Sequence, residues 1–264
     1  MKVVAFNKLS VSYLDDLDGG GIWLAKDFLR FVKALKSAFS IPGKFRRVFE
    51  WCSGPGFIGF ALLGEGLCDA LCLADINPLA IDCVRDTISN NKLEGQVTAY
   101  VSDNFKSIPR EEQFDLVVAN PPNYFSINPR HPSYNQVKDD LRPNDPGWRV
   151  HRDFYASVRN HLLDGALLVI SEVDPRKSKV FLRSNEPVYD IRPRPALTDF
   201  KAMIMAGGLD YVGAFPYKKE ERFELAMVVS RKAQSAQAPA TEEQCVELMR
   251  QIGSREMTAQ ESLL

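Results

Sequence analysis

A strand, a small-residue turn and a helix start carry the residue types that can hold a nucleoside-containing ligand. The apolar run Val48–Trp51 predicts a buried strand, 52–56 (Cys-Ser-Gly-Pro-Gly) predicts a turn, and a helix begins near Phe57. Glycines let a ligand approach the backbone where a Cβ would collide, and a helix start offers N–H groups without intrahelical partners. Asp75 ends the next apolar run, where a carboxylate can bind two ribose hydroxyls. The sequence therefore predicts a nucleoside site.

Other polar residues also follow apolar runs. Asp103 and Asn104 come after a predicted strand at 97–101, and Asn120-Pro-Pro-Asn comes after one at 114–119. A fifth strand is predicted at 166–170, and helices alternate with these strands, which indicates a parallel sheet with helices on both faces. Ligands of such sheets bind at the carboxyl ends of the strands, where all of these polar residues fall.

The chain is predicted to consist of three parts. Residues 1–44 form a cap or lid segment, whose helix either covers an edge of the sheet or follows a glycine hinge at 19–21. Residues 45–232 form the α/β domain, which ends in two strands whose short polar connection requires antiparallel pairing. Residues 233–264 form a linker followed by an amphipathic helix or a disordered tail.

Composition limits the function classes. The 264 residues are 45% hydrophobic and 25% charged, with a net charge of −1, which is typical of a soluble α/β protein and argues against bulk attraction to nucleic acid. No signal region or long apolar stretch is present, so we expect a cytoplasmic protein without membrane contact. The five cysteines form no Cys-x-x-Cys pair and the three histidines lack metal-ligand spacing, so we expect reduced cysteines and no metal site.

Taken together, Glu50-x-x-x-Gly54-x-Gly56, Asp75, Asp103 and Asn120-Pro-Pro resemble class I S-adenosylmethionine-dependent methyltransferases over roughly residues 45–230. The resemblance implies a Rossmann-like, doubly wound seven-stranded sheet that is mostly parallel with an antiparallel last strand. Within that group, Asn-Pro-Pro and the run 145–155 are most similar to the release-factor glutamine methyltransferases.

The resemblance also implies roles for individual residues. Asp75 would bind the ribose hydroxyls of S-adenosyl-L-methionine, Ile76 would pack on adenine and Asp103 would accept a bond from the adenine amine. The Asn120 side-chain oxygen and a carbonyl of Pro121 or Pro122 would accept hydrogen bonds from the target amino group. The candidate cofactor-binding set is Glu50, Cys52, Ser53, Gly54, Gly56, Asp75, Ile76, Asp103, Asn104 and Asn120, and the candidate catalytic set is Asn120, Pro121, Pro122, Asn123 and Tyr124.

Three departures bear on the acceptor. Cys52 stands where the family has a first glycine, Glu50 where Asp is commoner, and Asn123 where an aromatic residue stacks on a planar target, a role that Tyr124 or Phe125 could take. The short segment before the first strand leaves no room for the substrate-docking domain of release-factor methyltransferases. These departures favour a small-molecule or amino-acid-like nitrogen acceptor.

Three alternatives stay open. They are a protein glutamine, an adenine of RNA or DNA, and a nicotinamide dinucleotide-dependent oxidoreductase. The basic segment 174–195 is either a solvated loop or a lid that contacts an anionic substrate, with Arg176, Lys177, Lys179, Arg183, Arg192 and Arg194 as its cations.

Overall fold

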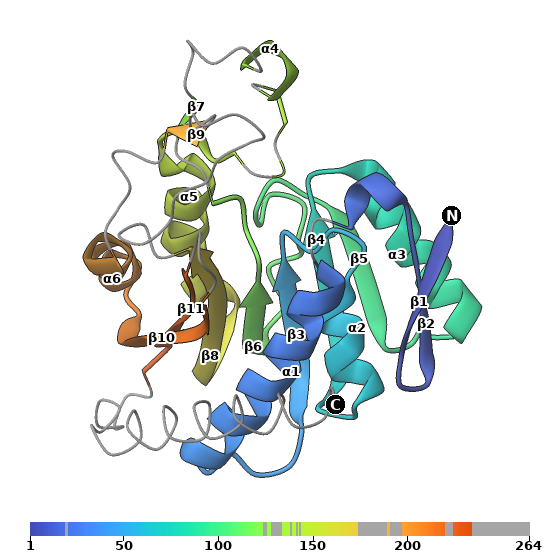
Figure 1. Ribbon diagram of the computed structural model, residues 1–264. Helices are drawn as coiled ribbons and strands as arrows, with labels where there is room; N and C mark the ends of the chain where they lie inside the picture. Colours follow the sequence, from blue (N-terminus) through green and yellow to red (C-terminus); the bar gives the residue numbers. More distant parts are fainter. Residues whose placement is uncertain are drawn as a thin grey trace.

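A seven-stranded sheet forms the centre of the molecule, in the order β10-β11-β8-β6-β3-β4-β5 (Figure 1). The computed structural model describes residues 1–18, 21–123, 126–127, 134–137, 139–140, 142, 144–173, 189–190, 197–219 and 224–233. The strands of the sheet are β3 (Phe45–Trp51), β4 (Cys68–Asp75), β5 (Val97–Val101), β6 (Phe114–Ala119), β8 (Leu162–Val173), β10 (Asp210–Lys219) and β11 (Glu224–Arg231).

The sheet reverses its winding between β3 and β6. From β3 the chain adds β4 and β5 on one side, and then returns to place β6 parallel to β3 and β8 parallel to β6 on the other side. β11 pairs antiparallel with β8 and with β10, which confirms the predicted mostly parallel sheet with an antiparallel end. Ligands of open α/β sheets bind where the winding reverses, so the expected site lies above the carboxyl ends of β3 and β6.

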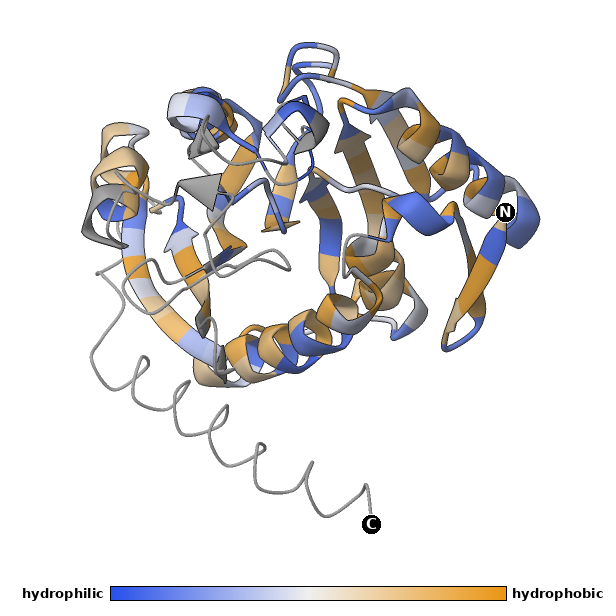
Figure 2. Cartoon of the chain, turned by 45° about the horizontal axis from the view of Figure 1, so that its top comes forward, coloured by the Kyte–Doolittle hydropathy of each residue, from blue (hydrophilic) through white to orange (hydrophobic). Residues whose placement is uncertain are grey.

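Helices cover both faces of the sheet. On one face α1 (Gly21–Ala38), α2 (Phe57–Gly64) and α3 (Pro78–Asn91) share an apolar core with the sheet, and on the other α5 (Arg149–Ser157) and α6 (Leu197–Ala206) do so. In Figure 2 the strands of the sheet have hydrophobic stretches that are interrupted by hydrophilic residues. The sequence accounts for the start of α3, because Pro78 occupies its first turn and the Asn77 side chain accepts a hydrogen bond from the Leu79 N–H at 3.0 Å.

An N-terminal hairpin is a feature that the sequence analysis did not predict. β1 (Lys2–Phe6) pairs antiparallel with β2 (Leu9–Tyr13), followed by a 3-10 turn at Asp15–Leu17. The hairpin docks on α3, where the Ser12 N–H donates to Thr87 Oγ1 at 2.9 Å. Two five-residue strands are marginal alone and depend on this docking, which no local pattern reveals. Of the predicted glycine hinge, Gly19 and Gly20 lie outside the described residues.

The strand–helix pattern around β8 also differs from the prediction in its boundaries. β8 is longer than the apolar run 166–170, and before it the chain forms α5 and then a 3-10 turn at Val158–His161. Shorter described elements are α4 (Tyr134–Val137), a 3-10 turn at Pro146–Trp148, and the paired strands β7 (Ser126–Ile127) and β9 (Tyr189–Asp190). The predicted C-terminal helix lies outside the described residues. Within the described segments, no helix has the length and apolar character needed to cross a bilayer.

Candidate active site

The turn between β3 and α2 is compact and left-handed at three positions. Cys52, Gly54 and Gly56 have φ values of 52°, 51° and 84°. A Cβ on Gly56 would come within 2.9 Å of the Phe60 ring, whereas a Cβ on Gly54 would meet no atom within 4 Å. A glycine is therefore needed at position 56 both for the close packing against Phe60 and for the positive φ, whereas Gly54 borders open space. Ser53 is buried, and its N–H donates to the Ala74 carbonyl at 3.0 Å, which ties the turn to β4.

Glu50 lies behind this turn. Successive side chains of β3 alternate between faces, so Glu50 points toward α2, where it accepts hydrogen bonds from the N–H groups of Ile58 at 3.3 Å and Gly59 at 2.6 Å. The sequence led us to expect unpaired N–H groups at this helix start, but this buried carboxyl already occupies two of them. Burial raises the pKa of Glu50 to about 8, although both hydrogen bonds oppose that rise.

Asp75, at the end of β4, joins the turn to the start of α3. One carboxylate oxygen accepts from the Gly54 N–H at 2.8 Å and the other from the Asn77 N–H at 2.9 Å. Each oxygen keeps a second lone pair, so the carboxylate remains able to accept from a ribose diol. Burial raises its pKa above the ordinary value. Beside it, Ile76 is 46% exposed, and Leu79 and Val101 are also exposed, which leaves apolar surface at the ends of β4 and β5.

Asp103 and Asn104 follow β5 but have different surroundings. Asp103 is paired with Lys106 at 2.7 Å and with Arg149 at 3.2 Å, and these bonds lower its pKa. Asn104 is buried with φ 53°, and its side chain accepts from Trp51 Nε1 at 2.7 Å and donates to the Val150 carbonyl at 3.2 Å. The Asn104 side chain thus links β3 to α5, whereas the Asp103 carboxylate lies at the rim.

The segment Asn120–Asn123 leaves the end of β6 beside the turn after β3. Within the described part of the chain, no hydrogen bond holds the Asn120 side-chain amide. Asn123 donates its side-chain amide to the Pro121 carbonyl at 2.8 Å, and Pro121 is buried. Asn120 therefore retains its full hydrogen-bonding capacity at the point where the winding reverses. Tyr124 and Phe125 lie outside the described residues, as does most of the basic segment 174–195.

A buried charged cluster next to this segment was not identified from the sequence. His151 on α5 places Nδ1 2.6 Å from Asp145 and Nε2 3.0 Å from Glu172, which lies near the end of β8. All three side chains are at most 1% exposed. The run 145–155 contains two members, but their partnership with Glu172 depends on the packing of α5 on β8.

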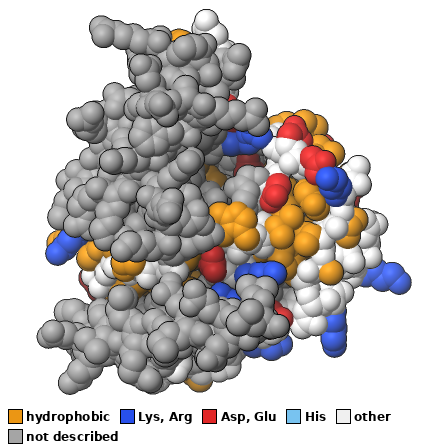
Figure 3. All heavy atoms as spheres, in the orientation of Figure 1, with side chains coloured by type: hydrophobic (Ala, Val, Ile, Leu, Met, Phe, Trp, Pro, Cys, Tyr) orange, Lys and Arg blue, Asp and Glu red, His pale blue; other side chains and the backbone are white. Residues whose placement is uncertain are grey.

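Several carboxylates lie around the turn. Burial raises the pKa of the Cys52 thiol, and four carboxylates within electrostatic reach raise it further, namely those of Asp75, Asp145, Asp103 and Glu172. In Figure 3, acidic and apolar side chains lie side by side on the described part of the face that it presents. A cationic sulfonium cofactor with a ribose and an adenine fits these residues, because the site combines carboxylates, exposed apolar side chains and open space beside Gly54.

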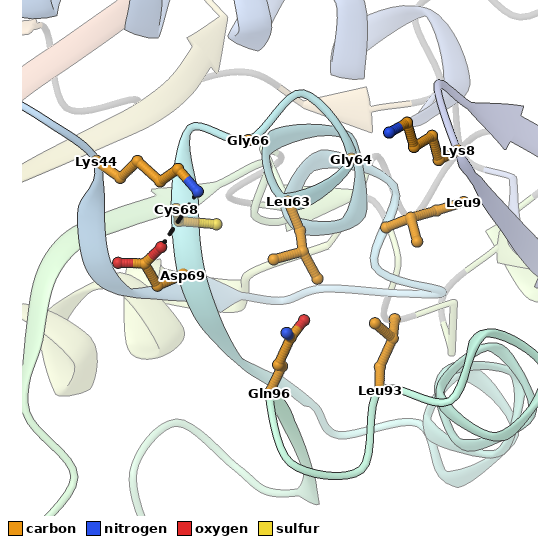
Figure 4. Close-up of a pocket in the computed structure, with 10 residues that line it drawn as sticks. All are labelled: Lys8, Leu9, Lys44, Leu63, Gly64, Gly66, Cys68, Asp69, Leu93 and Gln96. Atoms are coloured by element: carbon orange, nitrogen blue, oxygen red, sulfur yellow. Dashed lines mark ion pairs between the residues drawn. The ribbon is translucent and has the colours of Figure 1, made fainter.

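A pocket of about 240 Å³ lies elsewhere, at the amino ends of the strands. Figure 4 shows it between the hairpin, the end of α2 and the starts of β4 and β5, with Lys44 paired to Asp69 at 3.4 Å. It contains none of the candidate residues. In the described residues, no group of three or more His, Cys, Asp and Glu side chains is arranged to hold a metal ion.

Comparison with known proteins shows what part of the chain is similar to. The family profile of the methyltransferase small domain matches residues 27–128. The ribosomal RNA small subunit methyltransferase C of Actinobacillus pleuropneumoniae serotype 3 (strain JL03) is 35% identical over 124 residues, which are 47% of this chain and 32% of that protein. The protein of the same name from Haemophilus influenzae (strain PittGG) is 33% identical over 93 residues, 35% of this chain and 26% of its own length. The chain thus matches about a third or less of the length of these curated relatives.

Solved structures agree on the fold. An S-adenosylmethionine-dependent methyltransferase from Clostridium acetobutylicum ATCC 824 superposes with a TM-score of 0.52 at 13% identity, covering 79% of this chain and 92% of that one. A methyltransferase from Pyrococcus furiosus gives 0.52 at 12% identity, covering 87% and 92%. Residues 27–128 therefore match the methyltransferase small domain, the chain has the class I methyltransferase fold, and its methyl donor is S-adenosyl-L-methionine, as the sequence predicted. The alternative of a nicotinamide dinucleotide enzyme has no support in these findings.

Proposed function

We propose that this chain, which carries a class I S-adenosylmethionine-dependent methyltransferase domain, methylates a nitrogen of an RNA base. The observation that carries the proposal is the Asn120 side-chain amide, which lies at the reversal of the sheet winding and makes no hydrogen bond within the described structure. A delocalised amino nitrogen is a weak nucleophile, and acceptors on both of its N–H bonds favour its pyramidal, reactive form.

The residues of the site would have separate roles in methyl transfer. When bound, S-adenosyl-L-methionine supplies an electrophilic methyl group on a cationic sulfur. Asp75 would hold the ribose, and the exposed side chains of Ile76 and Val101 would contact the adenine. The Asn120 oxygen and a proline carbonyl would accept from the target N–H bonds, so orientation and electrostatic stabilisation would supply most of the rate. The Pro121 carbonyl already accepts from Asn123 and has one lone pair left for a substrate.

The choice of acceptor rests on the relatives. The sequence analysis favoured a small molecule, but the curated proteins that match this chain bear the name ribosomal RNA small subunit methyltransferase C. Ribosomal RNA is therefore the first acceptor to test. A protein glutamine and a small amine are the alternatives that the same geometry would serve.

The test supplies the full chain and labelled S-adenosyl-L-methionine with small-subunit ribosomal RNA, with a glutamine peptide or with free nucleosides. We expect label in RNA, located on a base nitrogen by mass spectrometry of the digested nucleosides. Asn120→Ala should lower methyl transfer by about 100-fold or more while S-adenosylhomocysteine affinity changes less than about 10-fold. Asn123→Ala removes the donor to the Pro121 carbonyl and leaves the Asn120 amide intact, so it should cost much less. Label in the peptide or the nucleosides but not in RNA would overturn the proposal.

A further inference from the structure

The cluster of Asp145, His151 and Glu172 joins two parts of the fold beside the candidate catalytic segment. Asp145 precedes α5 and accepts from the N–H groups of Val150 and His151, at 2.8 and 3.1 Å, through its two carboxylate oxygens. The ring of His151 then reaches across to Glu172 on β8. The imidazole is thus the bridge between the start of α5 and the sheet.

The register places Glu172 next to the candidate catalytic segment. β6 and β8 are parallel, with Ala119 opposite Ile170, so Glu172 lies two residues beyond that pair, as Pro121 does on the other strand. Alternation along β8 puts Ile170 and Glu172 on the face that α5 covers. The cluster therefore adjoins the Asn120–Pro122 segment from the α5 side.

The geometry constrains the protonation state. A neutral imidazole has one N–H, whereas both ring nitrogens of His151 lie within hydrogen-bond distance of a carboxylate oxygen. Two donated bonds require the imidazolium. Burial alone would lower the pKa of His151, but the charges and hydrogen bonds of Glu172 and Asp145 outweigh it and raise the pKa to about 9.

The surroundings make this bridge rigid. The ring packs edge-on against Trp51 at 5.4 Å and Trp148 at 4.9 Å between centroids, and it lies tilted against Phe200 of α6 at 5.4 Å. Among the described residues, the titratable or charged groups that interact electrostatically with its two carboxylates include Cys52, Arg149, Tyr155 and Tyr217. The ring is fully buried, since His151 is 0% exposed.

We propose that His151 is a positioning residue for methyl transfer: by donating to a carboxylate on each side, it ties the end of β8 to the start of α5 and fixes the wall of the acceptor pocket beside Asn120–Pro122. Its role in transfer rests on the function proposed above. Because Asp75 lies on the opposite side of the turn, loss of the bridge should impair acceptor alignment and leave cofactor binding intact. A misplacement of about 1 Å in the reacting groups can cost about 100-fold in rate.

The first test needs no acceptor. With labelled histidine, NMR should show His151 as an imidazolium at neutral pH, titrating near pH 9. Glu172→Gln should lower that midpoint by at least about one unit, since it removes one of the two charges that hold the proton. In the same variant, hydrogen exchange should quicken at the amides of Asn120, Asn123 and the first turn of α5, and stay unchanged around Asp75. A neutral His151 at pH 7, or unchanged exchange at these amides, would overturn the proposal.

The second test measures function. Glu172→Gln should retain S-adenosylhomocysteine affinity within about threefold but lose about 10-fold or more in methyl transfer, with the loss growing as pH rises through the lowered midpoint. Asp145→Asn, which changes the other side of the ring, should act in the same direction. The matched control is His161→Gln, because His161 is also buried but bonds a backbone carbonyl, that of Glu112, at 3.0 Å. This control should leave the pH profile of transfer unchanged.

The outcomes separate the two proposals. If wild type methylates no RNA while the NMR and exchange results hold, the proposed acceptor is wrong and the bridge stands. If Glu172→Gln loses cofactor binding and transfer together, or if His161→Gln alters the pH profile equally, His151 has only a general structural role and the positioning proposal fails.

Discussion

Glu50 should make the stability of this protein fall as pH rises through the neutral range. Its carboxyl is 2% exposed, and its pKa is raised by burial from 4.5 to about 8 in the fold. Because the folded pKa is the higher one, the folded state binds more protons between these two values, and stability decreases with rising pH across that window. The contribution is fully present below pH 4.5 and is lost as pH passes 8.

The size of the loss follows from linkage. Each unit of pKa difference is worth about 1.4 kcal/mol. With the two pKa values above, Glu50 alone should remove about 3 kcal/mol of unfolding free energy between about pH 6 and about pH 9. Glu50→Gln has no titrating group at this position, so its unfolding free energy should lack this pH-dependent contribution. It also loses part of the hydrogen bonding to the N–H groups of Ile58 and Gly59, and this loss costs about 1–3 kcal/mol at every pH.

Urea unfolding of wild type and Glu50→Gln over this pH range measures the effect. The relevant quantity is how the difference in unfolding free energy between the two proteins changes with pH. The variant should be the less stable protein at the acidic end, and the gap should close or reverse at the alkaline end. Other groups cancel in the comparison, including His151. Glu50→Met, which removes both hydrogen bonds, should be less stable than Glu50→Gln by a constant amount with the same slope. Parallel curves for wild type and Glu50→Gln would refute the reasoning, because they would mean that Glu50 does not change its ionisation in this window.

Three further predictions concern the turn and the end of β4. Cys52→Gly should be more stable than Cys52→Ala by about 1 kcal/mol in urea unfolding, because both lose the thiol but only glycine relieves the φ of 52°; equal stabilities would argue against strain there. Asp75→Asn should weaken S-adenosylhomocysteine binding about 10-fold or more in calorimetry, while the free protein keeps most of its melting temperature. An unchanged affinity would mean that Asp75 does not bind the cofactor. Gly59→Ala should destabilise by about 1–3 kcal/mol in thermal unfolding, because its Cβ would lie 2.7 Å from Glu50 Oε2; a melting temperature equal to that of wild type would contradict the packing of α2 against Glu50.

Local patterns in the sequence determined the elements and the edge of the sheet where the site lies. The apolar runs 97–101 and 114–119 became β5 and β6 with the same boundaries, because buried parallel strands are continuous apolar runs ended by turn residues. Pro78 and Asn77 marked the start of α3 in the same local way. The nucleoside site also followed from the sequence, since glycines and an acid at consecutive strand ends are a short-range signature, and the family resemblance then implied S-adenosyl-L-methionine.

Only the tertiary structure decided how side chains are shared between elements. Glu50 bonds the start of α2, and the Asn104 side chain joins Trp51 to α5. The bridge from His151 to Glu172 exists because β8 lies beside β6 and α5 packs on that face. Sequence periodicity tells which face of a strand or helix is buried, but it does not tell which buried polar group will meet another. That pairing depends on strand order and helix packing, and it is imposed by the cost of leaving a buried charge without a partner.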